Sequence, residues 1–238
     1  MFRTLFSVSN FLLPRYCCGC KKIMNNFEDV ICAECLCELG RSWSVFEDKD
    51  DLRKRTSIYY PIKNSGAFII YAKDSKASSL IAKFKYGDDV IIGKYLMKSF
   101  SYEVRKLDWI NDIDLIIPLP LHWRKTWSRG YNQSEVIANE IGKIFNIRVE
   151  TKAIKRVKHN KSQVRKSPRE RWSNVENIFK LCDHKKLEGK HVLIVDDIVT
   201  TGASINSCVK EISKVKDIEI SVIALGVTES PFGSISIY

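Results

Sequence analysis

The stretch His191-Val-Leu-Ile-Val-Asp-Asp-Ile-Val-Thr-Thr-Gly-Ala-Ser204 joins an apolar run to a polar turn that contains glycine. The apolar run predicts a buried strand that delivers Asp196 and Asp197 to the carboxyl edge of a sheet, where open α/β sheets bind ligands. Two adjacent carboxylates are costly there unless they hold sugar hydroxyls or a cation. The turn that follows offers hydroxyls and free backbone N–H groups at a helix N-terminus, which suits a phosphate. This order of residues predicts a sugar-phosphate site.

A plainer interpretation of the same stretch is an acidic turn followed by an ordinary Thr/Ser helix cap. It does not explain why carboxylates, glycine and hydroxyls come in the order that a sugar phosphate requires. A P-loop nucleotide site is not supported, because the sequence has no G-x4-G-K-[ST] pattern.

Outward from this stretch, strands and helices are expected to alternate. Apolar runs predict strands at residues 66–72, 113–117, 191–195 and 218–227. Helical spacing predicts helices through Leu80 and Phe84, and at residues 88–107, 132–145 and 203–215, with two more at residues 2–13 and from the capping box at 167–170. Such alternation is typical of an α/β fold, with a mostly parallel sheet and helices on both faces.

The cysteines predict a small N-terminal metal module. Six of the eight lie between Cys17 and Cys37, and they include two C-x2-C steps, Cys17 to Cys20 and Cys32 to Cys35. Two such steps can place four thiolates around Zn2+ in a tetrahedron. Cys37 is an alternative ligand, and buried or redox-active thiols are the alternative to a metal site. With the polar linker expected at residues 47–55, we expect residues 1–56 to form an appendage and residues 57–238 one α/β domain.

Charge is concentrated in one part of the chain. The net charge is +11, and from Leu121 to Arg171 there are 14 Lys+Arg against four Asp+Glu. This segment is expected to meet a polyanion, either a phosphorylated small molecule or a nucleic acid. Its candidate nucleic-acid-binding residues are Lys155, Arg156, Lys158, Lys161, Arg165 and Lys166. Tryptophans on either side could stack on bases, so a single-strand surface and a basic loop that closes over a small anion are both open.

No run of about 18 apolar residues exists, which excludes a membrane-spanning helix on sequence grounds. No small-residue cleavage site follows the N-terminal apolar stretch either. We therefore expect a cytoplasmic protein.

The stretch from Val192 to Ser204 resembles the phosphoribosyl pyrophosphate (PRPP) motif of type I phosphoribosyltransferases. Further landmarks narrow the resemblance to the ComF family and cover nearly the whole chain. In order, they are the paired C-x2-C steps, Lys83-Phe-Lys-Tyr-Gly87, Ile117-Pro-Leu-Pro120, Arg129-Gly-Tyr-Asn-Gln133, Gln163 with Arg169-Glu-Arg171, and Asn174-Val175. Leu119, Val164 and Ser204 depart mildly from the family pattern, and a hydroxyl is kept at position 204.

The resemblance implies a role for each of these positions. Asp196 and Asp197 would bind the ribose hydroxyls of PRPP, and the turn Thr200, Thr201, Gly202, Ala203 and Ser204 would hold its 5′-phosphate. The turn Pro118, Leu119, Pro120 and Leu121 occupies the place of the pyrophosphate-binding loop. Mg2+ would be held mainly by oxygens of PRPP. Arg129 is the candidate for stabilising the departing pyrophosphate, and a surface arginine that caps a turn is the alternative.

The resemblance also implies a role in DNA uptake during natural transformation (competence), with PRPP and, in one hypothesis, single-stranded DNA and uptake machinery as partners. The first hypothesis is a phosphoribosyltransferase whose acceptor the sequence does not specify. The second is a catalytically silent PRPP sensor or single-stranded DNA-binding module. A nucleobase-salvage enzyme in nucleoside metabolism is least favoured, since it has no use for the Cys module and the basic segment.

Overall fold

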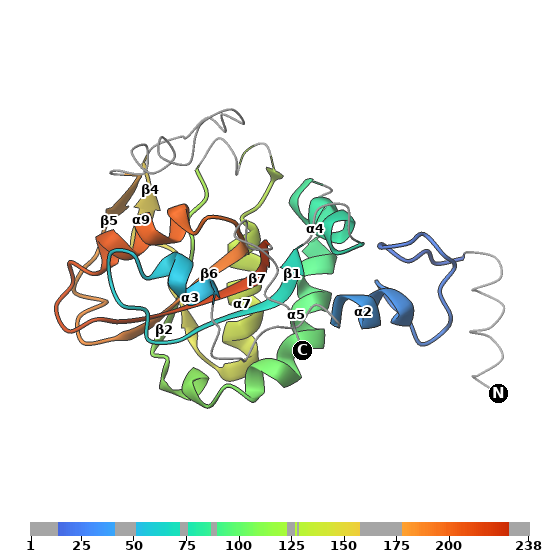
Figure 1. Cartoon of the computed structure of the whole chain (residues 1–238), viewed down its shortest axis with the longest axis horizontal. Helices are drawn as coiled ribbons and strands as arrows, with labels where there is room; N and C mark the ends of the chain where they lie inside the picture. Colours follow the sequence, from blue (N-terminus) through green and yellow to red (C-terminus); the bar gives the residue numbers. More distant parts are fainter. Residues whose placement is uncertain are drawn as a thin grey trace.

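The computed structural model describes residues 14–40, 51–71, 76–86, 90–122, 127, 129–157 and 178–228. Within these ranges, five parallel strands form a sheet in the order β1-β7-β6-β2-β3 (Figure 1). They are β1 (Ser65–Tyr71), β2 (Leu115–Pro118), β3 (Arg148–Val149), β6 (His191–Val199) and β7 (Glu219–Thr228). A separate antiparallel pair consists of β4 (Ile154–Arg156) and β5 (Phe179–Leu181). The parallel sheet confirms the predicted fold class. The β4–β5 pair was not predicted, because strands of three residues are too short to show a period.

Helices cover both faces of the sheet, and the side chains of β6 alternate between the two layers. Leu193 and Val195 belong to one hydrophobic cluster, together with residues of α4, α5 and α7. Val192 and Ile194 belong to the other cluster, together with residues of α3 and α9. The helices are α2 (Ala33–Gly40), α3 (Asp51–Thr56), α4 (Lys76–Tyr86), α5 (Val90–Arg105), the 3-10 turn η1 (Asp108–Asp112), α7 (Gln133–Phe145) and α9 (Ala203–Ile212). Because β6 is buried on both faces, its sequence is a continuous apolar run.

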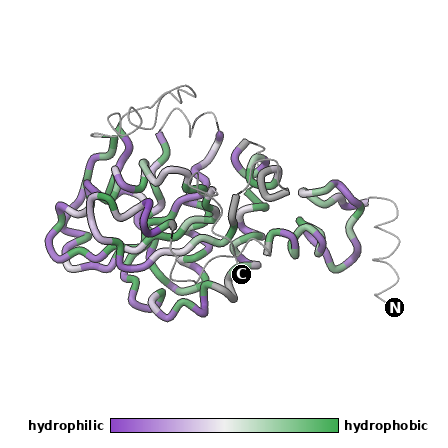
Figure 2. Tube along the Cα trace, viewed as in Figure 1, coloured by the Kyte–Doolittle hydropathy of each residue, from purple (hydrophilic) through white to green (hydrophobic). Residues whose placement is uncertain are grey.

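Hydrophobic residues are concentrated in the central strands, as Figure 2 shows. The core side chains of β6 and β7 are buried, which agrees with the apolar runs that predicted these strands. The predicted strands and the helices α4, α5, α7 and α9 are confirmed with small shifts at their ends. The helices expected at residues 2–13 and from 167–170 lie outside the described residues.

Helix α3 lies in the segment that was expected to be a linker. Leu52 and Thr56 are 3% and 0% exposed, and the helix contacts β1, β7 and α9. Its sequence Asp-Leu-Arg-Lys-Arg-Thr has a single large apolar residue, so no hydrophobic period announces it. This helix forms because of its tertiary packing, and the helix brings Arg55 beside the turn that follows β6.

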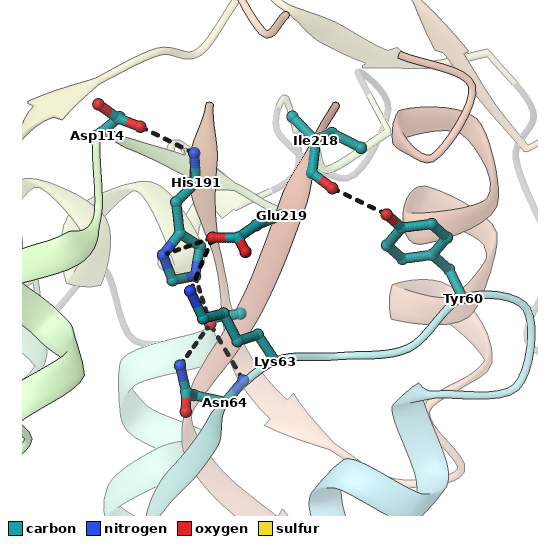
Figure 3. Close-up of polar contacts among 8 residues, drawn as sticks. Tyr60, Lys63, Asn64, Asp114, His191, Ile218 and Glu219 are labelled. Carbon is teal, nitrogen blue, oxygen red and sulfur yellow. Dashed lines mark hydrogen bonds and ion pairs between the residues drawn. The ribbon is translucent and has the colours of Figure 1, made fainter. Parts of the chain in front are cut away.

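The amino ends of β6 and β7 carry a polar cluster in which His191 and Ser221 are buried (Figure 3). The His191 backbone N–H donates to Asp114 at 2.8 Å, and His191 Nε2 lies 2.8 Å from Ser221 Oγ. Lys63 pairs with Glu219 at 2.8 Å, and Glu219 lies 3.8 Å from His191 Nδ1. Burial, followed by the charge of Lys63, lowers the pKa of His191. The cluster joins neighbouring strands at the amino edge of the sheet, opposite the predicted sugar-phosphate site.

The N-terminal Cys module lies beside α4 and α5, at the end of the molecule opposite the β4–β5 pair (Figure 1). Cys17, Cys32 and Cys35 belong to the same hydrophobic cluster as Phe84 and Leu96, so the module is packed against the α/β domain. In the parts of the chain that the structure describes, no helix has both the length and the hydropathy to cross a membrane.

Candidate functional site

Strand β6 places Asp196 and Asp197 at the carboxyl edge of the sheet, as predicted. Asp196 pairs in register with Ala224 of the neighbouring strand β7. Its Oδ1 accepts a hydrogen bond from Ser134 Oγ at 3.0 Å and another from the Asp197 backbone N–H at 2.8 Å. Ser134 lies in the first turn of α7, so this helix helps to hold the carboxylate.

The two carboxylates are in different electrostatic surroundings. Burial, followed by the charge of Asp197, raises the pKa of Asp196 to about 7. Asp197 instead forms an ion pair with Lys85 of α4, whose Nζ lies 3.1 Å from Asp197 Oδ2. The side chains of Lys85 and Asp197 are only 23% and 13% exposed, so solvent screens the pair weakly. The site can therefore take a sugar hydroxyl that donates to one carboxylate and accepts from a protonated one.

The turn after β6 packs closely against α3. Gly202 has φ of +73°, and a Cβ at this position would come within 2.4 Å of the Arg55 carbonyl oxygen. Asn206 Nδ2 donates to the carbonyls of Gly202 and Arg55, while Asn206 Oδ1 accepts from the Ile58 N–H at 3.0 Å. Only glycine fits this position, because it needs both a left-handed conformation and close backbone contact.

The Arg55 side chain also stabilises this turn, through a hydrogen bond to its first residue, Thr200. Its Nη1 donates to the Thr200 carbonyl at 2.6 Å and to Thr228 Oγ1 at 3.2 Å. Thr200 and Thr201 are exposed, and the ten-residue helix α9 begins at Ala203, so hydroxyls directly precede the N-terminal N–H groups of this helix. This arrangement can bind a phosphate group.

The turn after β2, Pro118, Leu119, Pro120 and Leu121, lies beside the end of β6. Pro118 is in register with Val195, and the Leu119 N–H donates to the Val195 carbonyl at 2.8 Å. Asn132 Nδ2 donates to the Leu119 carbonyl at 3.2 Å. Three of the four turn residues line a cavity of about 740 Å³, whose other walls are Trp127, Gly130, Asn132, Glu135, Thr151, Ile154, Lys155 and Arg156.

The segment Arg129-Gly-Tyr-Asn-Gln133 supports the end of α4. Arg129 Nη1 donates to Gln133 Oε1 at 3.2 Å, and Gln133 Nε2 donates to the Lys85 carbonyl at 3.3 Å. Tyr131 OH donates to the Phe84 carbonyl. The role predicted for Arg129 toward pyrophosphate stays a prediction. Tyr131 and Gln133 of this motif contact α4, and Asn132 contacts Leu119.

Two of the predicted nucleic-acid-binding residues are in the described part of the chain. Lys155 and Arg156 belong to β4, and both line the cavity described above. Arg156 lies over the ring of Phe179, 5.5 Å from its centroid, and burial lowers the pKa of its guanidinium. Lys158, Lys161, Arg165 and Lys166 lie outside the described residues.

The four predicted metal ligands, Cys17, Cys20, Cys32 and Cys35, are brought together. Their sulfur atoms lie within 4.8 Å of one another, and Cys20 Sγ is 3.6 Å from Cys32 Sγ. A tetrahedral Zn2+ with bonds of about 2.3 Å needs sulfur separations of about 3.8 Å, so the cluster fits the ion. Cys37 is exposed and is not part of the group.

Hydrogen bonds favour the thiolate of one of these cysteines. Burial works against ionisation, but backbone N–H groups, including those of Cys32 and Gly19, lower the pKa of Cys17 to about 6. These two groups lie 3.2 and 3.3 Å from Cys17 Sγ. Burial raises the pKa of Cys35, and a bound cation would oppose that effect.

Sequence reasoning missed Lys85, Arg55 and Asn206. Lys85 lies within the Lys83-to-Gly87 landmark, so the motif was found but not its contact with Asp197. No sequence pattern indicated a role for Arg55 or Asn206, because their contacts join positions about 150 residues apart.

The chain is similar to several known proteins over the part that contains this site. The family model "Phosphoribosyl transferase domain" matches residues 131–226. Competence protein F of Haemophilus influenzae is 32% identical over 61% of this chain and 65% of that protein. DNA utilization protein YhgH of Escherichia coli K12 is 30% identical over 54% of this chain and 57% of that protein. The chain thus spans less than two thirds of the length of these relatives.

A solved structure, the purine phosphoribosyltransferase of Pyrococcus horikoshii, is 15% identical, with a TM-score of 0.36 over 60% of this chain and 90% of that chain.

Proposed function

We propose that this chain binds PRPP at the carboxyl edge of its sheet, because its residues 131–226 match the phosphoribosyl transferase domain and it is similar to competence protein F. One observation carries the proposal. A partly buried carboxylate pair near the carboxyl end of β6 is followed directly by an exposed hydroxyl-rich turn at the N-terminus of α9. The carboxylates suit ribose hydroxyls, and the turn suits a 5′-phosphate.

Each part of the site has a separate task. Asp197 accepts a hydrogen bond from a ribose hydroxyl, and Asp196, with a pKa of about 7, either accepts or donates one. The N–H groups and hydroxyls from Thr200 to Ser204 donate to the 5′-phosphate. Arg55 and Asn206 act through the turn, whose backbone they hold.

Phosphoribosyl transfer requires stabilisation of the departing pyrophosphate. Pro118, Pro120 and Leu121 line one cavity together with the cations Lys155 and Arg156, and Arg129 lies four residues before Gln133, the first residue of α7. Mg2+, which would be held mainly by PRPP oxygens, would supply positive charge to the leaving group. The protein contributes cations that are held in place before the bond breaks.

The biological role that we propose is DNA uptake in natural transformation, in the cytoplasm. It rests on the names of the relatives, which are a competence protein and DNA utilization proteins. The acceptor of the phosphoribosyl group is undefined, so the enzyme class is a phosphoribosyltransferase of unassigned acceptor.

Calorimetry with PRPP, with and without Mg2+, tests binding, and pyrophosphate release against a panel of bases tests turnover. We expect wild type to bind PRPP in an Mg2+-dependent way and Asp197→Asn not to bind it. Asp183→Asn, which replaces a carboxylate away from the site, is the control and should bind PRPP like wild type. Release with an acceptor would establish an enzyme, and robust turnover with one free base would favour salvage. Equal affinity of the Asp197→Asn variant would remove the ribose role.

The second candidate is a PRPP sensor or module that binds single-stranded DNA without turnover. Trp127, 88% exposed, lines the same cavity as Lys155 and Arg156, so an aromatic ring accompanies the cations. An aromatic ring beside cations is the usual composition of a single-strand surface. Replacing Lys155 and Arg156 with Ala should weaken binding of an oligonucleotide and flatten its salt dependence. Unchanged binding would exclude this surface.

A further inference from the structure

The last turn of α4 contacts both the Cys module and the predicted PRPP site. Lys83 Nζ donates to the Cys18 carbonyl, inside the first C-x2-C step. Lys85 Nζ lies 3.1 Å from Asp197 Oδ2. Helical residues are about 100° apart around the axis, so side chains two positions apart point to nearly opposite sides. One helical turn therefore spans the two sites.

The Cys18 carbonyl is held by the loop that the metal would order. The Cys18 N–H donates to the Val30 carbonyl at 2.9 Å, and the Lys21 N–H donates to the Cys17 carbonyl at 3.0 Å. Cys17 and Cys20 on either side are two of the four clustered thiols. A metal bound to these thiols would fix the carbonyl to which Lys83 donates.

Phe84, between the two lysines, makes this turn rigid. Its side chain is fully buried, and it packs so closely on α5 that a Cβ at Gly93 would come within 2.4 Å of the ring. The carbonyls of Phe84 and Lys85 accept hydrogen bonds from Tyr131 and Gln133. Because this turn is rigid, Lys83 and Lys85 keep a fixed position relative to each other, and one backbone segment presents a lysine to each site.

Lys85 matters for an anionic ligand because of the charge beside it. PRPP carries several negative charges, and two adjacent carboxylates repel them at short range. Lys85 neutralises Asp197, and an ammonium group has three donors, so it can bind Asp197 and a ligand oxygen together.

We propose that Lys85 is a PRPP-binding residue and that Lys83, through the metal-ordered Cys loop, is the residue that positions it. This inference rests on the proposed function, since it concerns the affinity for PRPP. It predicts that metal occupancy of the four-Cys site and PRPP binding are coupled. Coupling is reciprocal in equilibrium binding, so each ligand changes the affinity for the other by the same factor, typically about tenfold.

The test uses the full, zinc-loaded chain and calorimetry with PRPP and Mg2+. Lys85→Met should weaken PRPP binding by at least about tenfold, which is within the usual range for a lost charged hydrogen bond. Lys83→Met should weaken it by about five- to tenfold, and Lys83→Arg, which keeps a donor, should restore it. Lys94→Met, an exposed lysine on α5, is the matched control and should bind like wild type.

A second measurement does not depend on turnover, and its wild-type part does not depend on the stability of any variant. The zinc affinity of wild type is measured by competition with a chelator, with and without saturating PRPP. PRPP should tighten zinc binding about tenfold in wild type and not in Lys83→Met.

The outcomes separate this inference from the proposed function. If wild type binds PRPP but Lys83→Met binds it equally well and PRPP leaves the zinc affinity unchanged, the coupling is refuted and the PRPP site stands. If Lys85→Met binds normally, its role in binding is refuted. If wild type does not bind PRPP, the proposed function fails and this inference fails with it.

Discussion

Replacing Asp196 with Asn should stabilise the ligand-free protein, by an amount that grows with pH. The pKa of Asp196 is raised from an ordinary 3.8 to about 7 by burial, then by the charge of Asp197. Asn keeps the Oδ1 acceptor that Ser134 Oγ and the Asp197 N–H use. The substitution therefore removes the buried charge without removing its hydrogen bonds.

The sign follows from proton linkage. The folded protein holds the Asp196 proton more tightly than the unfolded chain, so wild type loses stability as pH rises from about 4 through about 7. Each pH unit between these values costs about 1.4 kcal/mol. The free energy of unfolding of Asp196→Asn should thus exceed that of wild type by about 1.5 kcal/mol at pH 5 and about 4 kcal/mol at pH 8.

Urea unfolding of both proteins from pH 5 to pH 8.5, without PRPP or Mg2+, measures this difference. Asp114→Asn is the control, because hydrogen bonding from the His191 N–H lowers the pKa of Asp114. That variant should be less stable than wild type, by an amount that hardly changes over this range. The same Asp196→Asn variant should bind PRPP at least about tenfold more weakly. A stability difference that is independent of pH would refute the electrostatic argument.

Three further predictions concern the turn, the metal module and the amino-end cluster. Gly202→Ala should lower the free energy of unfolding, measured in urea, by about 1–3 kcal/mol, because Gly202 has a positive φ and lies against Arg55. Gly189→Ala should lower it less, because Gly189 has a positive φ but open space around it. Equal losses in the two variants would contradict the role of the Arg55 contact. Cys32→Ser should lower the zinc content found by elemental analysis from one ion per chain to none, with Cys37→Ser unchanged; a metal-free wild type would end the zinc proposal. In thermal unfolding, the stability of wild type relative to His191→Gln should fall as pH drops below about 6.5, because the folded state lowers the pKa of His191; parallel pH profiles would show that another group titrates.

Local sequence was enough for the main strands and for the chemistry of the site. The run from His191 to Val195 had to be buried because it is apolar on both alternating faces, and the sheet confirms this. Asp196, Asp197 and the turn to Ser204 follow one another in the chain, so their proximity needed no tertiary information. The C-x2-C steps likewise predicted the four thiols that meet, since each step is a local turn, and the structure then decided against the alternative ligand Cys37.

Tertiary structure alone decided what surrounds these residues. The helix containing Arg55 has almost no apolar period and forms because Leu52 and Thr56 are buried against the sheet. The β4–β5 pair joins segments too short to show a pattern. The ion pair of Lys85 with Asp197 joins residues from two elements far apart in the chain. A sequence records neighbours along the chain and the period of burial, whereas contacts between distant positions depend on how whole elements pack. The residue types of the site were therefore readable from the sequence, and the groups that set their charge and position were not.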